Sequence, residues 1–246
     1  MSSPHPPRNR LLARLPDAEL LRLSEYLETV HLKLGMVIYE SGQALREVYF
    51  PIDCIISLLC VMNDGDSAEI AIVGNEGMVG IAQIMGGETT TSRAVVQSEG
   101  SAYRLNALVM RDEFSTCAPL RELLLLYTQA LMTQMMQTAG CNLHHSVEQQ
   151  FCRWLLMSLD RLPSDKIMMT QGLIANMLGL RRVGVTDAAR KLQDVGIIQY
   201  SAGTITVLDR KKLQQHACEC YAAVKRELDR LLPGLESKVN EPSSGT

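Results

Sequence analysis

Apolar and polar positions change their spacing three times along the chain. From Leu11 to Leu27, leucines recur at helical spacing, and Pro16-Asp17 is the start signal of a second helix. Short apolar runs separated by glycine-rich turns follow. These runs are Val37–Tyr39, Val48–Phe50, Ile55–Met62, Ala68–Val73, Ala94–Gln97 and Ala102–Leu105. Short strands at close spacing predict an antiparallel β-roll over residues 9–119.

A long helix is expected next, over residues 120–145. Four apolar residues are spaced by four, three and four positions, as in the seam of a coiled coil: Leu120, Leu124, Tyr127 and Leu131. The helix joins two compact regions and is apolar on several faces, so it needs more than one neighbour. We therefore favour a dimer helix over a core helix of one domain. Ser146 is expected to cap the following helix, with Glu148 or Gln149 in its first turn.

The third region, residues 146–232, has the order helix, tight turn, helix, hairpin. Thr170 is a suitable N-cap for a helix over 171–178, and Gly179 ends that helix. A second helix is expected from Arg181 or Arg182 to Val195. Two β runs, 197–200 and 204–208, flank a hairpin turn, and a single last helix is expected over 211–232. This order predicts a winged helix-turn-helix, and the whole chain is of the α+β class.

The second of these helices has one apolar and one polar face. The polar face carries Arg182, Val183, Thr186, Asp187 and Arg190, with Lys191 to one side and Arg181 just before. From Ile167 to Lys212 there are seven basic and three acidic residues, so the segment is +4 in a chain of net charge −3. A local positive excess of this kind is what phosphate binding requires. The sequence therefore predicts a surface for double-stranded DNA here.

Individual roles follow from the chemistry of base edges and phosphates. Arg182 is expected to contact guanine, and Val183 a thymine methyl group. Thr170 and the amides of Gln171 and Gly172 form a helix N-terminus that suits a phosphate. Arg190 and Lys191 are expected to contact phosphates as well.

Composition excludes several other classes of protein. The N-terminus lacks the apolar core of a signal peptide, and no apolar run is long enough to cross a membrane, so a cytoplasmic location is expected. The seven cysteines lie mostly in apolar segments and include no CxxC pair, so buried free thiols are expected. Cys218 and Cys220 would lie on different faces of a helix. No catalytic set, metal motif or phosphate loop is visible, so we expect no enzyme, no cofactor and no metal.

The segment from Thr170 to Arg182 resembles the helix-turn-helix of the Crp/Fnr regulators. The order of β-roll, long helix and winged helix, the Leu11–Pro16 opening and the turns at Gly35 and Ser41-Gly42 also match. The resemblance covers residues 9–208. It implies a homodimer that binds an inverted repeat and contacts RNA polymerase.

The chain also departs from the family pattern. Val183 stands where the family often has Glu, and Asp187 stands where it has a second Arg. Asp187 cannot bind phosphate but can accept from a cytosine amino group, so an altered DNA site is expected.

The roll lacks the cyclic-nucleotide pattern of that family. Ile81 replaces the Glu that would accept from the ribose, and Ser92-Arg93 reverses the expected Arg-Ser order. A shift of one residue on a strand sends a side chain to the opposite face. Gly80, Ser92 and Arg93 remain the candidate effector-binding residues. A small molecule, a redox change at Cys54 or Cys60, and no ligand all stay open.

We therefore expect a sequence-specific DNA-binding regulator that acts as a homodimer. The alternative is a β-roll effector module whose C-terminal part makes protein contacts only.

Overall fold

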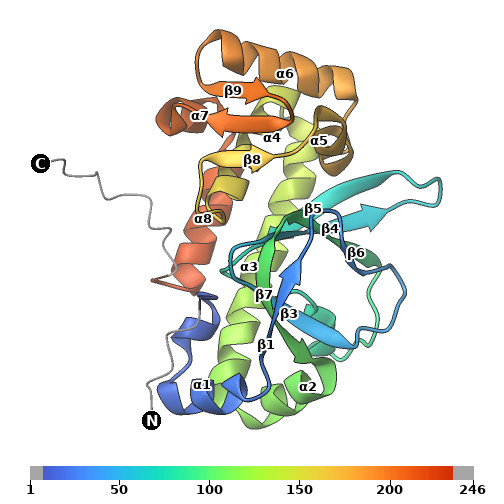
Figure 1. Ribbon diagram of the computed structural model, residues 1–246, viewed down its shortest axis with the longest axis vertical. Helices are drawn as coiled ribbons and strands as arrows, with labels where there is room; N and C mark the ends of the chain where they lie inside the picture. Colours follow the sequence, from blue (N-terminus) through green and yellow to red (C-terminus); the bar gives the residue numbers. More distant parts are fainter. Residues whose placement is uncertain (1–7, 235–246) are drawn as a thin grey trace, which may run out of the picture.

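The computed structural model describes residues 8–234 of the 246-residue chain. The fold is α+β, as predicted. Figure 1 shows a β-roll beside one half of the long helix α3 and a smaller helical unit with its own sheet at the other end. Helix α8 returns from this smaller unit along α3 toward the N-terminal helix α1.

Two antiparallel sheets form the roll. One has the strand order β1–β7–β3, with β1 at Glu28–Leu32, β7 at Gly100–Asn106 and β3 at Glu47–Pro51. The other has the order β2–β6–β4–β5, with β2 at Val37–Tyr39, β6 at Ser92–Ser98, β4 at Ile55–Val61 and β5 at Ser67–Val73. The helices around it are η1 (Leu12–Arg14), α1 (Asp17–Ser24), η2 (Ile81–Gln83) and α2 (Ala107–Thr116).

Sequence patterns missed strand β1, helix α2 and the short helix η2. Strand β1 is largely exposed and carries polar residues, so it lacks the apolar alternation of a half-buried strand. Helix α2 begins where the Asn106 side chain accepts a hydrogen bond from the Leu108 amide at 2.8 Å. Asparagine is a good N-cap, so the start of α2 could have been recognised from the sequence.

Helix α3 spans Ala118–His144 and is 27 residues long. The four residues predicted as its dimer seam lie in the core of their own chain: Leu120, Leu124, Tyr127 and Leu131 are at most 3% exposed and pack with the roll. The Tyr127 hydroxyl also donates to the Met78 carbonyl at 3.1 Å. That seam assignment is wrong, because these side chains cannot also face a partner.

A different stripe of α3 is exposed. Leu125, Met132, Met136 and Leu143 are spaced by seven, four and seven residues, so they share one helix face. Each is between 52% and 77% exposed. No helix in residues 8–234, α3 included, combines the length and apolar character needed to cross a membrane.

The C-terminal unit begins with α4 (Val147–Leu159). Its other elements are β8 (Lys166–Met168), α5 (Gln171–Leu178), α6 (Arg182–Asp194), β9 (Ile198–Ser201), β10 (Thr204–Val207), α7 (Arg210–His216) and α8 (Glu219–Leu231). Strand β8 was not predicted; it pairs with β10 and completes a three-stranded sheet in the order β8–β10–β9. Ser146 caps α4 in a capping box with Gln149, one of the two expected partners.

The expected last helix is instead two helices. Helix α7 contacts α4, whereas α8 lies mainly along α3 and touches α4 as well, and Ala217 between them is extended. The main partner of α8 is α3, whereas that of α7 is α4, so the chain bends although it contains no Pro or Gly at this point. Cys218 therefore lies at the N-cap of α8 rather than inside a helix, and its thiol comes close to Cys220. The prediction that these thiols diverge is wrong for this reason.

The C-terminal unit is seated on the outer face of the roll. Ile55, Leu59 and Ile72 of the roll belong to the same buried cluster as Phe151 and Trp154 of α4. A buried ion pair crosses this contact, with Arg161 Nε 2.6 Å from Glu76 Oε1. The two units therefore share both an apolar core and a buried charge pair.

Candidate nucleic-acid interface

Helices α5 and α6 are joined by a three-residue turn, Gly179 to Arg181. The Thr170 hydroxyl accepts from the Leu173 amide at 3.3 Å and so caps α5, as predicted. Gly179 ends α5 with φ +63°, a left-handed conformation that favours glycine. Arg181 is the N-cap of α6.

Helix α6 has the two faces that the spacing predicts. Val185, Ala188, Ala189 and Leu192 are buried, while Arg181, Arg182, Val183, Asp187, Arg190 and Lys191 are exposed. Val183 is 70% exposed, which is unusual for an aliphatic side chain and suits a surface that meets an apolar group. In Figure 1, α6 lies at the outer end of the molecule, away from the roll.

Thr186 is only partly exposed because its hydroxyl is engaged within the unit. It donates to Gln171 Oε1 at 2.8 Å and also lies 3.0 Å from the Arg182 carbonyl. This contact fixes the first turn of α5 against α6. Gln171 and Thr186 thus set the angle between the helices as well as lying on the predicted surface.

A groove beside α6 includes four residues that were not predicted to belong to the DNA-binding surface: Gln193, Tyr200, Ala202 and Gly203. It is lined by Thr170, Gln171, Arg182, Gln193, Tyr200, Ala202 and Gly203. Gln193 accepts from the Tyr200 amide at 2.7 Å, and the Tyr200 hydroxyl donates to the Met169 carbonyl at 2.7 Å. Gln193 follows Arg190 by three residues, so helical spacing alone places it on the reading face.

The hairpin next to this groove has a two-residue loop, Ala202-Gly203. Both residues have positive φ, +50° and +77°. Positive φ at both central residues is the signature of a type I′ turn, whose twist matches that of the strands. The loop projects the hairpin as a wing at the edge of the groove.

The basic residues on this surface differ in whether they already form an ion pair. Within residues 8–234, Arg181, Arg182 and Arg190 make no ion pair, so their guanidinium groups are available to an anion. Lys191 is different, because its ammonium lies 3.7 Å from Glu148, which also contacts His216 at 3.0 Å. Burial raises the pKa of Tyr200, and the charge of Arg182 opposes that rise.

The three candidate effector residues in the roll do not converge. Arg93 lies on the strand face of Val95, which packs toward the C-terminal unit, whereas Ala94 and Val96 face the roll core. Its Nε lies 3.2 Å from Glu40 Oε2. The Ser92 hydroxyl contacts Thr90 at 3.1 Å, and Gly80 adopts φ +102° beside Val48.

These positions do not fit a cyclic nucleotide. A cyclic phosphate needs an inward guanidinium, and Arg93 faces outward and is paired with a carboxylate. The outward position of Arg93 agrees with the register shift that Ser92-Arg93 introduces, and no inward arginine is available to a cyclic phosphate from this pair. Tyr39, Leu45 and Tyr49 are buried in the roll core and line a pocket there that contains neither Ser92 nor Arg93.

Two known protein domains are similar to parts of this chain. A cyclic nucleotide-binding domain model matches residues 29–117, and a Crp-like helix-turn-helix domain model matches residues 149–216. Together the two matches span more than half of the chain. A comparison with curated protein sequences finds no significant match.

Several solved structures share the fold. A putative transcriptional regulator of the Crp/Fnr family from Eubacterium rectale is 19% identical, with a TM-score of 0.65 over 83% of this chain and 96% of that one. FixK2 from Bradyrhizobium japonicum is 16% identical, with a TM-score of 0.65 over 78% of this chain and 98% of that one. The c-di-GMP-responsive regulator CLP from Xanthomonas campestris is 12% identical, with a TM-score of 0.64 over 79% of this chain and 100% of that one.

The chain thus has a cyclic nucleotide-binding-like roll followed by a Crp-like helix-turn-helix, in the order that defines one class of transcription regulator. It belongs to the Crp/Fnr family and binds DNA through residues of its C-terminal unit. This class consists of regulators rather than enzymes, in agreement with the absence of a catalytic motif in the sequence.

Proposed function

We propose that this protein is a homodimeric regulator that reads an inverted-repeat promoter site by inserting α6 of each protomer into the major groove. The observation that carries the proposal is the exposed face of α6, where three arginines without ion pairs among the described residues surround Val183 and Asp187. Recognition helices of this motif contact base edges with their N-terminal residues.

Base reading is assigned to the first two turns of α6. Arg182 makes a bidentate contact to guanine, and Val183 lies against a thymine methyl group. Asp187 accepts from a cytosine amino group, because a carboxylate there would repel phosphate. Thr186 holds the helix in place through Gln171.

Phosphate contacts flank this reading face. Thr170 already caps α5, so the free amides of Gln171 and Gly172 point out of the helix N-terminus toward a phosphate. Arg181 and Arg190 supply charge. Lys191 must exchange its contact with Glu148 for a phosphate, so it contributes less than the arginines.

The dimer is formed by the exposed stripe of α3. Leu125, Met132, Met136 and Leu143 repeat as in a two-stranded coiled coil and have no cover within residues 8–234. In this proposal residues 9–119 form the regulatory roll, 120–145 the dimer helix and 146–232 the DNA-binding unit.

Regulation would pass through the contact between the roll and the C-terminal unit. A Cβ placed on Gly179, in the turn before α6, would lie 3.2 Å from the Ala68 side chain of β5. An effector that shifts the β4–β5 hairpin would therefore move the turn that orients α6. Residues other than an inward-facing arginine would recognise such an effector. The DNA-bound dimer would act on RNA polymerase, as the family resemblance implies.

Selection of bound fragments from random double-stranded DNA tests this function. The proposal expects an enriched inverted repeat whose binding weakens steeply as salt increases, because phosphate contacts release counterions. Failure to enrich any repeat, with no salt-dependent binding, would favour the alternative that the C-terminal part contacts proteins only. Candidate small molecules added in parallel would reveal effector dependence.

A further inference from the structure

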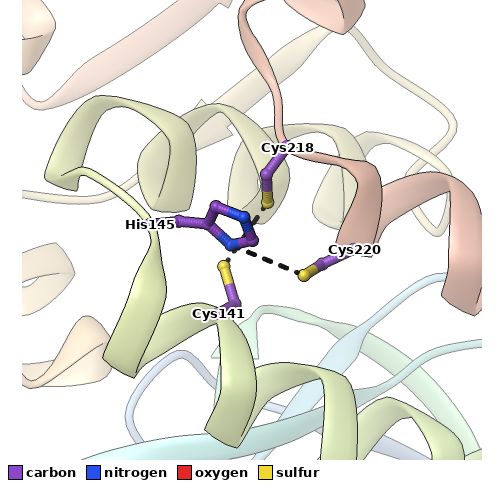
Figure 2. A group of neighbouring side chains, drawn as sticks. All are labelled: Cys141, His145, Cys218 and Cys220. Atoms are coloured by element: carbon purple, nitrogen blue, oxygen red, sulfur yellow. Dashed lines mark hydrogen bonds between the residues drawn. The ribbon is translucent and has the colours of Figure 1, made fainter.

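Three thiols and one imidazole meet where α3 ends and α8 begins. Cys141 is in the last turn of α3 and His145 is its C-cap, while Cys218 is the N-cap of α8 and Cys220 lies in its first turn. Figure 2 shows the four side chains pointing toward one another. Their ligand atoms all lie within 4.8 Å of one another.

The separations match those around one tetrahedral ion. Cys141 Sγ lies 3.5 Å from Cys218 Sγ, and Cys220 Sγ lies 3.6 Å from His145 Nδ1. Zinc bonds of about 2.3 Å to sulfur and about 2.0 Å to nitrogen place neighbouring ligands roughly 3.5–3.8 Å apart in a tetrahedron. A four-iron cluster puts each thiolate on a different iron atom and so needs ligands that are farther apart.

The imidazole is already held in the orientation that metal binding needs. Glu219 Oε1 lies 3.3 Å from His145 Nε2, on the ring edge opposite the thiols. A carboxylate on the outer nitrogen keeps the proton there and leaves Nδ1 free to act as a ligand. The Gln150 amide group also donates to the His145 carbonyl at 2.9 Å and fixes the backbone of that residue.

A buried positive charge stands beside the cluster. Arg153 is 4% exposed, its Nε has no hydrogen-bond partner, and it makes no ion pair within the described chain. Its Nη1 donates to the Thr138 hydroxyl at 3.1 Å, one helical turn before Cys141 on α3. A divalent ion with three thiolates and a neutral imidazole carries one net negative charge, which would compensate the buried guanidinium.

Ordinary core packing does not account for this group. Cys141, Cys218 and Cys220 form a buried cluster of their own, apart from the two large apolar cores, and it contains no aliphatic or aromatic residue. Thiols can pack as small apolar groups, but such groups normally lie among aliphatic neighbours.

We propose that Cys141, His145, Cys218 and Cys220 bind one Zn²⁺ ion in a closed tetrahedral site. Four protein ligands leave no open position, so the ion is structural. It would join α8 to the α3–α4 junction, where the chain passes from the proposed dimer helix into the DNA-binding unit. The ion would thereby fix the orientation of that unit on α3.

The zinc content of the untagged full-length protein tests the site, when the protein is produced in medium that contains zinc and is purified without a chelator. We expect about one zinc per chain. After removal of zinc, Co²⁺ should give the intense visible bands of tetrahedral coordination together with a thiolate charge-transfer band, and Zn²⁺ should displace it. These spectra are recorded on the wild-type chain, so they do not depend on any variant folding. Substoichiometric zinc without a cobalt–thiolate spectrum would overturn the proposal, as would iron with inorganic sulfide, or a Cys141–Cys218 disulfide in the freshly purified chain.

Matched variants locate the ligands. His145→Ala and Cys218→Ser should lose zinc, whereas the neighbouring exposed His144→Ala and the distant Cys60→Ser should keep it. His145→Cys preserves four ligands and should retain the ion. Wild-type zinc content in both Cys218→Ser and His145→Ala would contradict the assignment.

Discussion

Arg182 is the residue whose side chain and whose position on the helix most directly favour a contact with DNA. It is the first residue of α6, is exposed, and lines the groove between α5, α6 and the wing. Its guanidinium makes no ion pair within residues 8–234, so no internal contact must break before it meets a base. Helical periodicity sufficed to predict this face because a helix fixes the direction of each side chain locally.

Replacing this side chain tests the reading role. Arg182→Ala should weaken binding to the selected site by about 1–3 kcal/mol and relax one base position. Arg46→Ala, which removes the same charge from an exposed position on the roll, should leave specific binding unchanged. Titration of both variants against the selected site and its single-base substitutions measures the difference. Equal affinity of Arg182→Ala and wild type would remove Arg182 from the reading face.

Ala202 carries backbone strain in the wing. Its φ of +50° is left-handed, a conformation that costs a residue with a Cβ about 1–2 kcal/mol and that asparagine tolerates better. Ala202→Asn should therefore stabilise the chain by up to about 1 kcal/mol in urea unfolding, since Asn-Gly is the preferred type I′ pair. A lower stability of this variant would contradict the turn geometry.

Among the helices and strands, α3 shows that residue spacing alone does not determine which surface covers an apolar helix face. Leu120, Leu124, Tyr127 and Leu131 have the spacing of a seam, and they are buried, but by the roll of their own chain. Periodicity predicts that a face is covered and does not identify its partner. The same sequence also contains the spacing of the second stripe, Leu125, Met132, Met136 and Leu143. Only the three-dimensional fold shows that this second stripe is the exposed one.

Two adjacent substitutions separate these stripes. Met132→Glu should give a folded monomer, because two carboxylates would face each other in the proposed seam. Leu131→Glu should instead unfold the chain, since it buries a charge in the roll core. Sedimentation at low concentration and circular dichroism distinguish the outcomes. If Met132→Glu remains a dimer, the stripe is not the interface.

The bend between α7 and α8 lay beyond sequence reasoning for a related reason. Residues 211–232 carry helical spacing throughout, and nothing at Ala217 signals a stop. The break arises because α8 packs mainly along α3 whereas α7 packs on α4, which is a tertiary effect. It brings Cys218 and Cys220 to Cys141 and His145, so the four ligands come from distant segments and form no recognisable motif along the chain.

For the whole molecule, the order of the roll, the long helix and the C-terminal unit could be predicted from the sequence. The way in which the C-terminal unit packs on the roll could not. Strand, helix and wing signals are local, so the roll, α3 and the helix-turn-helix were all expected. The seating depends on buried contacts between distant segments. In one of these, Ser57 of β4 donates to Glu69 of β5 at 2.6 Å, and Gln97 of β6 donates to Ser158 of α4 at 3.1 Å.

Glu69 gives this buried network a pH dependence. Burial raises its pKa to about 7, against opposing effects of Ser57, Arg153 and Arg161. The folded chain therefore keeps a proton that the unfolded chain releases near its ordinary pKa of 4.5, and folding stability falls as pH rises from about 4.5 to about 7. Between pH 5 and pH 8, wild type should lose up to about 3 kcal/mol that Glu69→Gln does not lose. Urea unfolding of both chains at the two pH values measures this. A stability difference that is independent of pH would show that Glu69 is ionised in the folded state.

In the proposed complex, two copies of α6 read two half-sites whose spacing is fixed by the α3 dimer. The most direct test is the affinity of the protein for its selected inverted repeat after about 5 base pairs, half a helical turn, are inserted between the half-sites. We expect a loss of roughly 100-fold or more, because the second recognition helix would then face the wrong side of the duplex. Unchanged affinity for the site with the insertion would contradict it.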